Sequence, residues 1–292
     1  MIIRSVVPQP PGHRTGAQSV ERALDVLRCF ETVSGDLGVT EIAARTGLTV
    51  STSHRLTRAL CTYGLVVQDA RTERYRLGPT VVLLGRRAAQ DLGYALALPQ
   101  LEDLSADTGE SVNLGISSAA EVLVVLHVPS PQPLHVSQEP GSRLPAHASA
   151  MGKCLLAFAA YPTADLHNAP ELPRFTERTL TDAVSLAADL DRTRARGWAL
   201  NDEERNPGVR AVAAPVLDRA GGAVAAVAVQ GPTVRLTDAE LPELAARAIR
   251  TAQALAPLLT APPWGGAEAE LAAARRRIAE LEAELTNMRP VD

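Results

Sequence analysis

The sequence predicts an α+β protein with a small helical N-terminal domain and a larger C-terminal domain built on an antiparallel sheet. Its 292 residues suffice for two domains of ordinary size, each with a core of its own. The stretch from Val39 to Thr62 has the pattern of two short helices joined by a turn at Gly47. From Pro99 onward, strand patterns and helical patterns alternate, which is typical of an α+β domain.

The overall composition narrows the class of protein. The formal net charge is −4, from 29 basic and 33 acidic residues, so any attraction to nucleic acid must be local. The three cysteines are widely spaced and include no CxxC pair, which indicates neither a zinc site nor a disulfide framework and fits a reducing, cytoplasmic setting. Residues 1–15 lack the long apolar run of a signal peptide or membrane span, so we expect a disordered leader and no membrane partner.

Three short helices are expected after this leader. The first covers residues 19–32, where apolar side chains recur at helical spacing. The second has Thr40 as a plausible N-cap and ends at Gly47, where the chain must turn. The third begins within residues 49–51 and extends to Thr62. All three would share one small core.

The third helix has two chemically different faces. At about 100° per residue, its hydroxyl and arginine side chains fall within an arc of about 60°, opposite two leucines. The residues of this arc are Ser51, Arg55, Arg58 and Thr62, and the leucines are Leu56 and Leu60. Such a face suits the DNA major groove, where hydroxyls reach phosphates and arginine reads guanine edges. The alternative is an ordinary amphipathic helix whose charged side is solvated.

A strand, a polar turn and a second strand follow, in the order expected of a hairpin. Residues 51–76 carry five arginines and two acidic residues, which gives a local charge of +3. Arg71, Arg74 and Arg76 could contact the DNA backbone or the adjacent minor groove. Alternatively, they protect an edge strand from self-association. Because the hairpin directly follows the helices, we favour a winged helix-turn-helix over residues 16–79.

Residues 80–97 resume a helical pattern and are expected to form a linker helix between the two domains. Their apolar side chains are more numerous than one covering domain requires. We therefore expect part of this helix to pack against a second copy of the chain. A homodimer would set the spacing of two DNA half-sites.

Residues 98–260 are expected to form the second domain, an antiparallel sheet with helices before and after it. Turn signals and alternating patterns predict strands at 111–118, 121–130, 133–139, 198–203, 209–217 and 223–230. Helices are expected from a cap at Ser149 to Pro162, over 186–196 and over 238–259. Small residues at 148–152 leave backbone N–H groups free at a helix N-terminus, which suits an anionic or carbonyl group, although close packing of helix on sheet favours the same residues.

Residues 261–292 are expected to be separate from this domain. A Pro- and Gly-rich linker precedes a heptad pattern in which Leu271, Ile278 and Leu285 share one core position. Three heptads suffice for a short coiled-coil helix, and a single amphipathic helix folded onto the domain fits the pattern equally well.

No catalytic or metal-binding pattern stands out. His147 precedes a helix, but the other histidines show no ligand spacing, and we expect His147 to be a structural hydrogen-bonding residue. The acidic run at residues 201–204 is interpreted as a solvated turn. Because the sequence has no nucleophile elbow, P-loop or dinucleotide fingerprint, we expect no enzyme activity, no cofactor and no metal. An enzyme targeted by its N-terminal module is the alternative.

Five segments taken together resemble the isocitrate lyase regulator (IclR) family of bacterial transcription factors. In order, they are SVERALDVLRCF, LTVSTSHRLTRAL, YRLGPTVVLLG, RLPAHASAMGKCLLAF and the run from RTRARGWALNDEERNPG to AVAVQGP. The resemblance covers roughly residues 19–259. It implies a winged helix-turn-helix, a linker helix and a C-terminal effector-binding domain with a GAF-like α/β sheet. It also implies assembly as a homodimer or homotetramer.

The resemblance implies site residues as well. The recognition helix corresponds to residues 49–62, with Ser53 on its buried side, where we expect it to hydrogen-bond back to the helix. The expected DNA-binding residues are Thr49, Ser51, Thr52, Arg55, Arg58, Arg71 and Arg74. The expected effector-binding residues are Pro133, Val136, Leu144, Ala150, Met151, Asn201, Ala211, Ala228 and Gln230.

The implied function is a ligand-responsive transcriptional repressor that binds double-stranded operator DNA and a small-molecule effector. Ala228, Gln230 and Asn201 stand where relatives that bind small carboxylates have hydroxyl and acid side chains. We therefore expect neutral or mixed apolar and polar ligands in preference to small dicarboxylates. An activator whose C-terminal helix recruits another protein is a second possibility.

Overall fold

The computed structural model describes residues 15–31, 33, 35–118, 120–159 and 172–259. The chain forms two compact units, residues 1–88 and 89–292. Within the described ranges, no helix is both long and apolar enough to cross a membrane. The expected leader at 1–14 and the expected coiled-coil helix at 261–292 lie outside the described residues.

Three helices of the N-terminal unit enclose a small apolar core. They are α1 (Thr15–Arg28), α2 (Val39–Thr46) and α3 (Val50–Thr62). α1 begins and ends four residues earlier than expected. The buried side chains of this core are Val26, Phe30, Leu37, Ile42, Leu56, Leu60, Val66 and Tyr75. The apolar spacing in the sequence therefore identified all three helices.

Caps and a glycine turn define the helix-turn-helix. α2 begins after Gly38, whose N–H donates to the Glu41 carboxylate at 2.7 Å, so the expected N-cap at Thr40 is wrong. Gly47 ends α2 with a φ of 69°, a left-handed conformation that glycine adopts without steric cost. Thr49 caps α3 by accepting a backbone hydrogen bond at 3.2 Å.

A two-stranded hairpin completes the expected winged helix-turn-helix. Its strands are β1 (Val66–Gln68) and β2 (Tyr75–Leu77), which pair antiparallel. The Tyr75 side chain is 1% exposed, and its backbone also pairs with Leu37. The hairpin is therefore packed against the helices and not only attached to them through the chain.

Ser53 lies on the buried face of α3, as expected, and is 0% exposed. The expected hydrogen bond back to the helix is absent, because the Ser53 Oγ atom has no partner within the described residues. The neighbouring Thr57 hydroxyl does donate, to the Ser53 carbonyl at 2.7 Å. A buried hydroxyl without a partner loses its hydration with nothing in exchange.

Ser53→Ala is expected to raise the free energy of unfolding by about 1 kcal/mol, because it removes an unpaired buried hydroxyl and introduces a better helix former. Thr57→Val is the matched control, since it removes a hydrogen bond that is formed and should lower the free energy by about 1 kcal/mol. Urea unfolding followed by circular dichroism measures both changes. A loss of stability in Ser53→Ala would contradict this interpretation.

The expected linker helix at 80–97 is in fact two helices. α4 covers Pro79–Asp91 and α5 covers Tyr94–Thr108. The chain breaks at Gly93, which has a φ of 78°. A Cβ atom at this position would collide with the Leu258 carbonyl group. Only glycine fits this close approach in a left-handed conformation, so the break is fixed by packing and not by the helical pattern.

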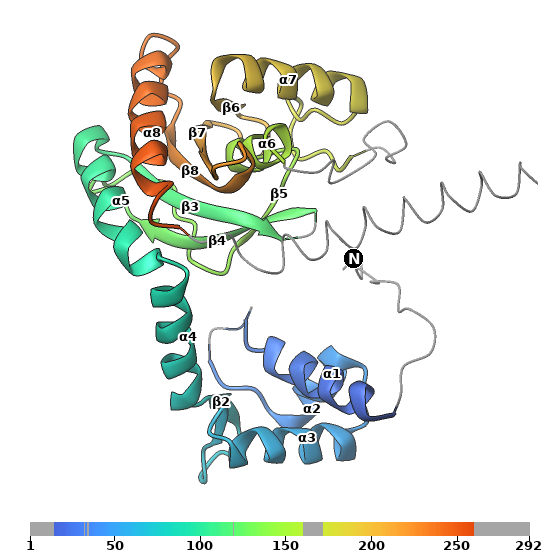
Figure 1. Cartoon of the computed structure of the whole chain (residues 1–292). Helices are drawn as coiled ribbons and strands as arrows, with labels where there is room; N and C mark the ends of the chain where they lie inside the picture. Colours follow the sequence, from blue (N-terminus) through green and yellow to red (C-terminus); the bar gives the residue numbers. More distant parts are fainter. Residues whose placement is uncertain (1–14, 32, 34, 119, 160–171, 260–292) are drawn as a thin grey trace, which may run out of the picture. The chain divides into compact units, whose positions relative to one another are not determined.

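A six-stranded antiparallel sheet organises the C-terminal unit (Figure 1). Its strands are β3 (Ser111–Ser118), β4 (Glu121–Val128), β5 (Arg143–Pro145), β6 (Ala199–Asp202), β7 (Val209–Leu217) and β8 (Ala223–Pro232). Their order across the sheet is β5-β4-β3-β8-β7-β6. The predicted fold class, a winged helix-turn-helix followed by an α+β domain, is confirmed.

The expected strand at 133–139 is wrong. The short strand β5, residues 143–145, pairs with residues 121–123 of β4 in its place. Pro133 has no N–H group to donate to a ladder, and Pro140 ends the segment. The segment reaches the sheet through the Val136 carbonyl, which accepts a hydrogen bond from the Gln230 side chain at 3.3 Å.

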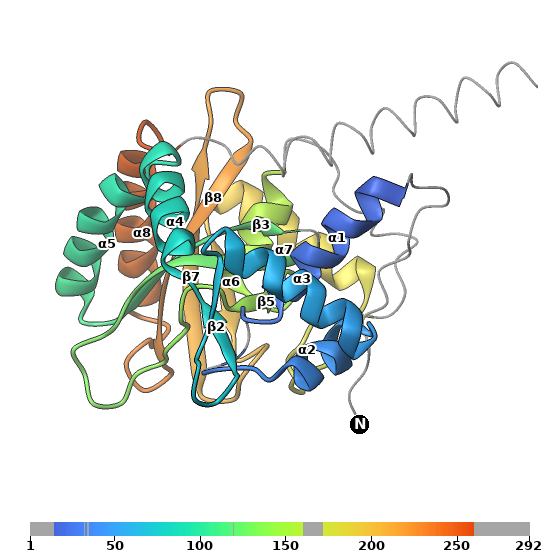
Figure 2. The same ribbon diagram turned by 90° about the horizontal axis from the view of Figure 1, so that it is seen from below.

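Helices cover both faces of the sheet. α5 and α8 (Leu241–Leu255) lie side by side on one face (Figures 1 and 2). α6 (Ala150–Ala157) covers the other face, with α7 (Ala183–Arg196) packed against it. The face under α6 presents small side chains from β7 and β8, namely Ala211, Ala213, Ala226 and Ala228. These small residues leave room between α6 and the sheet.

Candidate functional site

The exposed face of α3 carries the side chains expected to meet DNA. Ser51, Arg55 and Arg58 are exposed, and Thr52 is half-buried. The guanidinium groups of Arg55 and Arg58 have no ion-pair or hydrogen-bond partner in the described part of the chain. The Thr49 hydroxyl lies 2.9 Å from that of Thr52, so Thr49 is engaged in capping the helix.

The two expected wing arginines differ in their surroundings. Arg71 is exposed, and its backbone N–H donates to the Asp69 carboxylate at 2.8 Å, which shapes the turn of the hairpin. The Arg74 guanidinium donates to the Glu41 carboxylate at 2.6 Å and to the Asp36 carbonyl at 2.7 Å. Arg74 therefore anchors the hairpin to the N-terminus of α2, which differs from the expected contact with DNA.

A cavity lies in the C-terminal unit between the sheet and the N-terminus of α6. It contains about 380 Å³ of space that no protein atom fills, part of it open to solvent. Its lining residues are Gln138, Leu144, Ser149, Ala150, Met151, Asn201, Arg205, Asn206, Val209, Ala211, Ala228 and Gln230. Only about 20 Å³ of it can hold the centre of a water-sized sphere, so a small molecule would have to widen the cavity.

Most of the expected effector-binding residues line this one cavity. They are Leu144, Ala150, Met151, Asn201, Ala211, Ala228 and Gln230. Pro133 and Val136 are not among the lining residues. Pro133 is exposed, and Val136 is half-buried. Their segment is not a strand of the sheet, and it contributes Gln138 to the cavity wall in their place.

The N-terminus of α6 forms one wall of the cavity. The Ser149 hydroxyl accepts the Gly152 N–H at 3.1 Å and so satisfies one of the free donors of the helix. The N–H groups of Ala150 and Met151 have no acceptor among the described residues. A Cβ atom on Gly152 would collide with the backbone of Ala146, so this helix start requires glycine.

Asn201, at the end of β6, ties this wall to the turn that follows. Its side-chain N–H donates to the Ala148 carbonyl at 2.7 Å, and its side-chain oxygen accepts the Glu204 N–H at 3.0 Å. Both ends of the Asn201 amide are therefore used within the protein. The residue positions the loop before α6, and one N–H and one oxygen lone pair of its amide remain for a ligand.

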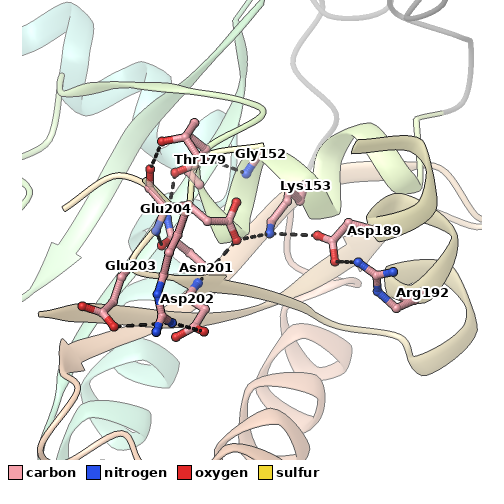
Figure 3. A network of polar contacts seen from close by, with 12 residues as sticks. Gly152, Lys153, Thr179, Asp189, Arg192, Asn201, Asp202, Glu203 and Glu204 are labelled. Carbon is pink, nitrogen blue, oxygen red and sulfur yellow. Dashed lines mark hydrogen bonds and ion pairs between the residues drawn. The ribbon is translucent and has the colours of Figure 1, made fainter. Parts of the chain in front are cut away.

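A buried charge network lies behind the α6 wall (Figure 3). The Lys153 side chain is 1% exposed, and its Nζ atom lies 2.5 Å from Glu204 Oε1 and 2.8 Å from Asp189 Oδ2. Arg192 contacts the other Asp189 oxygen at 3.0 Å. Because Glu204 is 6% exposed, the interpretation of residues 201–204 as a solvated turn is wrong at this position.

The two carboxyl groups of this network differ in their ionisation. Burial raises the pKa of Glu204, and the attraction of Lys153 offsets this only in part. At Asp189, burial is outweighed by Lys153 and Arg192, which hold the pKa of this carboxyl below its ordinary value. Lys153 is thus the cation that both buried acids share, and it joins α6, α7 and the turn after β6.

The remaining candidate groups have structural roles. His147 Nε2 lies 2.9 Å from the Pro173 carbonyl oxygen, and its ring contacts Phe175, so the expected structural role is confirmed. Burial raises the pKa of the Cys154 thiol to about 12, which makes it a poor nucleophile. The part of the chain that the structure describes holds no group of three His, Cys, Asp or Glu residues placed to bind a metal.

Four polar lining residues, Gln138, Ser149, Arg205 and Asn206, were not predicted as effector-binding residues from the sequence. Arg205 is half-buried, and burial lowers the pKa of its guanidinium, although arginine remains protonated. Its position directly after the turn at 201–204 was the available signal. Gln138 could not have been placed, because its segment has the pattern of a strand.

Two family profiles match the chain. One, described as the bacterial transcriptional regulator IclR C-terminal domain, matches residues 91–256. The other, the IclR helix-turn-helix domain, matches residues 19–70. One match lies in each compact unit.

Individual proteins are similar over most of their length. The chain is 39% identical to the HTH-type transcriptional regulator BhcR of Paracoccus denitrificans, over 82% of this chain and 86% of that protein. It is 32% identical to the transcriptional repressor IclR of Escherichia coli, over 81% of this chain and 88% of the relative. An IclR regulator from Alicyclobacillus acidocaldarius superposes with a TM-score of 0.75 at 26% identity, covering 82% of this chain and 98% of that structure.

Proposed function

The chain belongs to the IclR family of bacterial transcriptional regulators, and we propose on this basis that it is a repressor whose affinity for operator DNA changes when a small molecule binds beside α6. One observation carries the proposal. The same chain has an arginine face on α3 that no described residue engages, and its second unit has a cavity lined by residues of α6, β7 and β8. The choice of repressor over activator rests on the relative from Escherichia coli, which is named a repressor. Such a protein acts on chromosomal DNA in the cytoplasm.

The proposed DNA-contacting residues lie on α3 and at the tip of the hairpin. Ser51 and Thr52 would contact phosphates, Arg55 and Arg58 would reach base edges in the major groove, and Arg71 would contact the backbone beside it. Thr49 would act through the cap of α3. Arg74 would position the hairpin, since its guanidinium is already bound to Glu41 and Asp36.

The proposed response begins at the cavity beside α6. A ligand there would contact the start of α6 and the strands β7 and β8 at once. We expect this contact to favour one arrangement of the C-terminal unit and to move α4, which connects the two units. Moving α4 would change the spacing of two recognition helices, and with it the fit to an operator.

A homodimer or homotetramer is part of the proposal. α4 has no buried residue, and Val82, Leu83 and Leu84 are 71%, 67% and 59% exposed. Three adjacent large apolar side chains are costly in water, so a second copy of the chain is the partner we expect on this helix. A monomer of 30.9 kDa in sedimentation equilibrium at micromolar concentration would contradict this part of the proposal.

Gel-shift titration with the DNA upstream of the protein's own gene tests the function. A shift that survives an excess of unrelated DNA is the expected result, because base contacts from α3 add to the contacts with phosphates. A folded protein that gives no sequence-specific shift with this DNA, and selects no sequence from a random pool, would contradict the proposal.

A further inference from the structure

The cavity beside α6 has an unbalanced charge. Of its twelve lining residues, all within the described ranges, Arg205 is the one that carries a charge. Its guanidinium is half-buried and has no hydrogen bond or ion pair within the described residues. A partly desolvated cation without a counter-ion costs free energy in the empty protein. Such a group is retained at a binding site when a ligand supplies the missing charge.

The acidic residues next to Arg205 do not supply it, because each is already paired with another cation. Asp202 lies 2.5 Å from the Arg210 guanidinium, and Glu203 lies 3.5 Å from that of Arg178. Glu204 is bound to Lys153 at 2.5 Å. Each of these three consecutive carboxylates thus has a cationic partner other than Arg205. Arg205, the next residue along the chain, is left facing the cavity.

The loop that carries Arg205 is held in place by its own hydrogen bonds. Glu203 adopts a φ of 59°, and its carboxylate accepts the Gly208 N–H at 2.7 Å. The Glu203 N–H donates to the Val209 carbonyl at 3.1 Å. Thr179 donates to the Glu204 carbonyl at 2.6 Å, a contact drawn in Figure 3. The backbone on both sides of Arg205 is therefore held before any ligand binds, which lowers the cost of binding.

Other groups on the cavity wall also favour an anion, and one favours a hydrogen-bond donor on the same ligand. Within the described residues, the N–H groups of Ala150 and Met151 lack acceptors, and they stand at the positive end of the α6 dipole. The side-chain oxygen of Gln138 is buried, and no described residue donates a hydrogen bond to it. An anion would therefore be met by donors, and a hydroxyl or N–H group on the same ligand could reach Gln138. The remaining wall is apolar and includes Leu144.

We propose that Arg205 is an effector-binding residue, and that the effector is an organic anion whose carboxylate or phosphate group pairs with Arg205 while a hydroxyl or N–H group bonds Gln138. This inference rests on the proposed function and deepens it. It also changes the expectation from the sequence alone, which favoured neutral ligands because Ala228 and Gln230 replace hydroxyl side chains. The charge comes from a residue outside the set that the family resemblance pointed to.

Matched pairs of compounds test the charge requirement directly. The full-length protein is mixed with 4-hydroxybenzoate or 4-hydroxybenzamide, lactate or lactamide, and glycerol 3-phosphate or glycerol, and the thermal midpoint is measured. At least one anion is expected to raise the midpoint more than its neutral partner does. The carboxylate and phosphate arms identify which anion the cavity takes. If no anion exceeds its neutral partner, the proposal is wrong.

Arg205→Gln then locates the effect. Titration calorimetry is expected to show affinity for the preferred anion reduced by about 10- to 100-fold, the usual loss for a charge-assisted hydrogen bond. The thermal midpoint of the ligand-free variant should equal or exceed that of the wild type, because an unpaired charge is removed. If Arg205 had a purely structural role, its replacement would lower this midpoint. Arg205→Lys should retain part of the affinity. Arg219→Gln, at an exposed arginine of the same unit, is the matched control and should bind like the wild type.

A failure of the inference about Arg205 can be distinguished from a failure of the proposed regulatory function. Operator binding is measured on the same samples by fluorescence anisotropy. A preferred anion that binds through Arg205 without changing operator affinity would contradict the ligand response and leave the site intact. Release of the operator by a neutral compound, or an anion preference that survives Arg205→Gln, would overturn the inference about Arg205 alone.

Discussion

Lys153→Met is expected to lower the free energy of unfolding of the C-terminal unit by about 3–5 kcal/mol, the range found when one partner of a buried ion pair is removed. Lys153 is 1% exposed and is the shared cation of Glu204 and Asp189. Without it, both carboxylates lose their closest counter-charge, and the turn after β6 loses its link to α6. Urea unfolding followed by tryptophan fluorescence measures the change.

Two controls make this result specific. The triple variant Lys153→Met, Glu204→Gln and Asp189→Asn removes all three charges and should recover a large part of the loss, because no carboxylate is left unpaired. Glu243→Gln removes the carboxylate of a surface pair with Arg247, whose side chains are 61% and 34% exposed, and should cost far less. Equal losses in Lys153→Met and in the triple variant would show that charge pairing is not what Lys153 contributes.

Arg55→Ala is expected to weaken binding to the specific operator by about 10- to 100-fold for each recognition helix, the loss of one arginine contact with a base edge. Arg55 is exposed on α3 and has no partner within the described residues, so its loss should leave the fold unchanged. Fluorescence anisotropy at fixed salt measures the affinity for specific and for unrelated DNA.

The comparison with unrelated DNA decides the role of Arg55. A base contact predicts that specific binding falls far more than non-specific binding, whereas a phosphate contact predicts equal losses. Arg28→Ala, on α1, is the matched control, since Arg28 is an arginine of the same unit that is paired with Glu31. The assignment of Arg55 to the major groove is wrong if its replacement and that of Arg28 have the same effect on specific binding.

Local patterns in the sequence were sufficient for most of the fold. Apolar side chains at helical spacing gave the three N-terminal helices, and β7 has the expected bounds, Val209–Leu217. Gly47 marks the turn of the helix-turn-helix because its left-handed φ follows from the residue type. Such features depend on a few neighbouring residues, and they can be inferred without knowing what packs against them.

The errors concern contacts between residues far apart in the chain. The helix break at Gly93 is set by the distant Leu258 carbonyl, and Arg74 is bound by Glu41, which lies 33 positions earlier. Neither partner is visible in a helical or strand pattern. The same reason explains the cavity. Small residues were expected to line the cavity. Arg205 is left unpaired because the neighbouring acids are paired with Arg210, Arg178 and Lys153, and only the structure shows these pairs.

The central claim is that a ligand in the cavity beside α6 controls operator affinity, and a cavity-filling variant tests it most directly. Ala228 lines the cavity and is 2% exposed, so Ala228→Leu places a larger side chain inside the cavity. The substitution does not alter the α3 face. Operator affinity is measured by anisotropy with and without the compound that gives the largest thermal shift. We predict a change of about 5- to 150-fold in the wild type. The variant should bind the operator normally and show no change, whereas an equal response in both proteins would contradict the account.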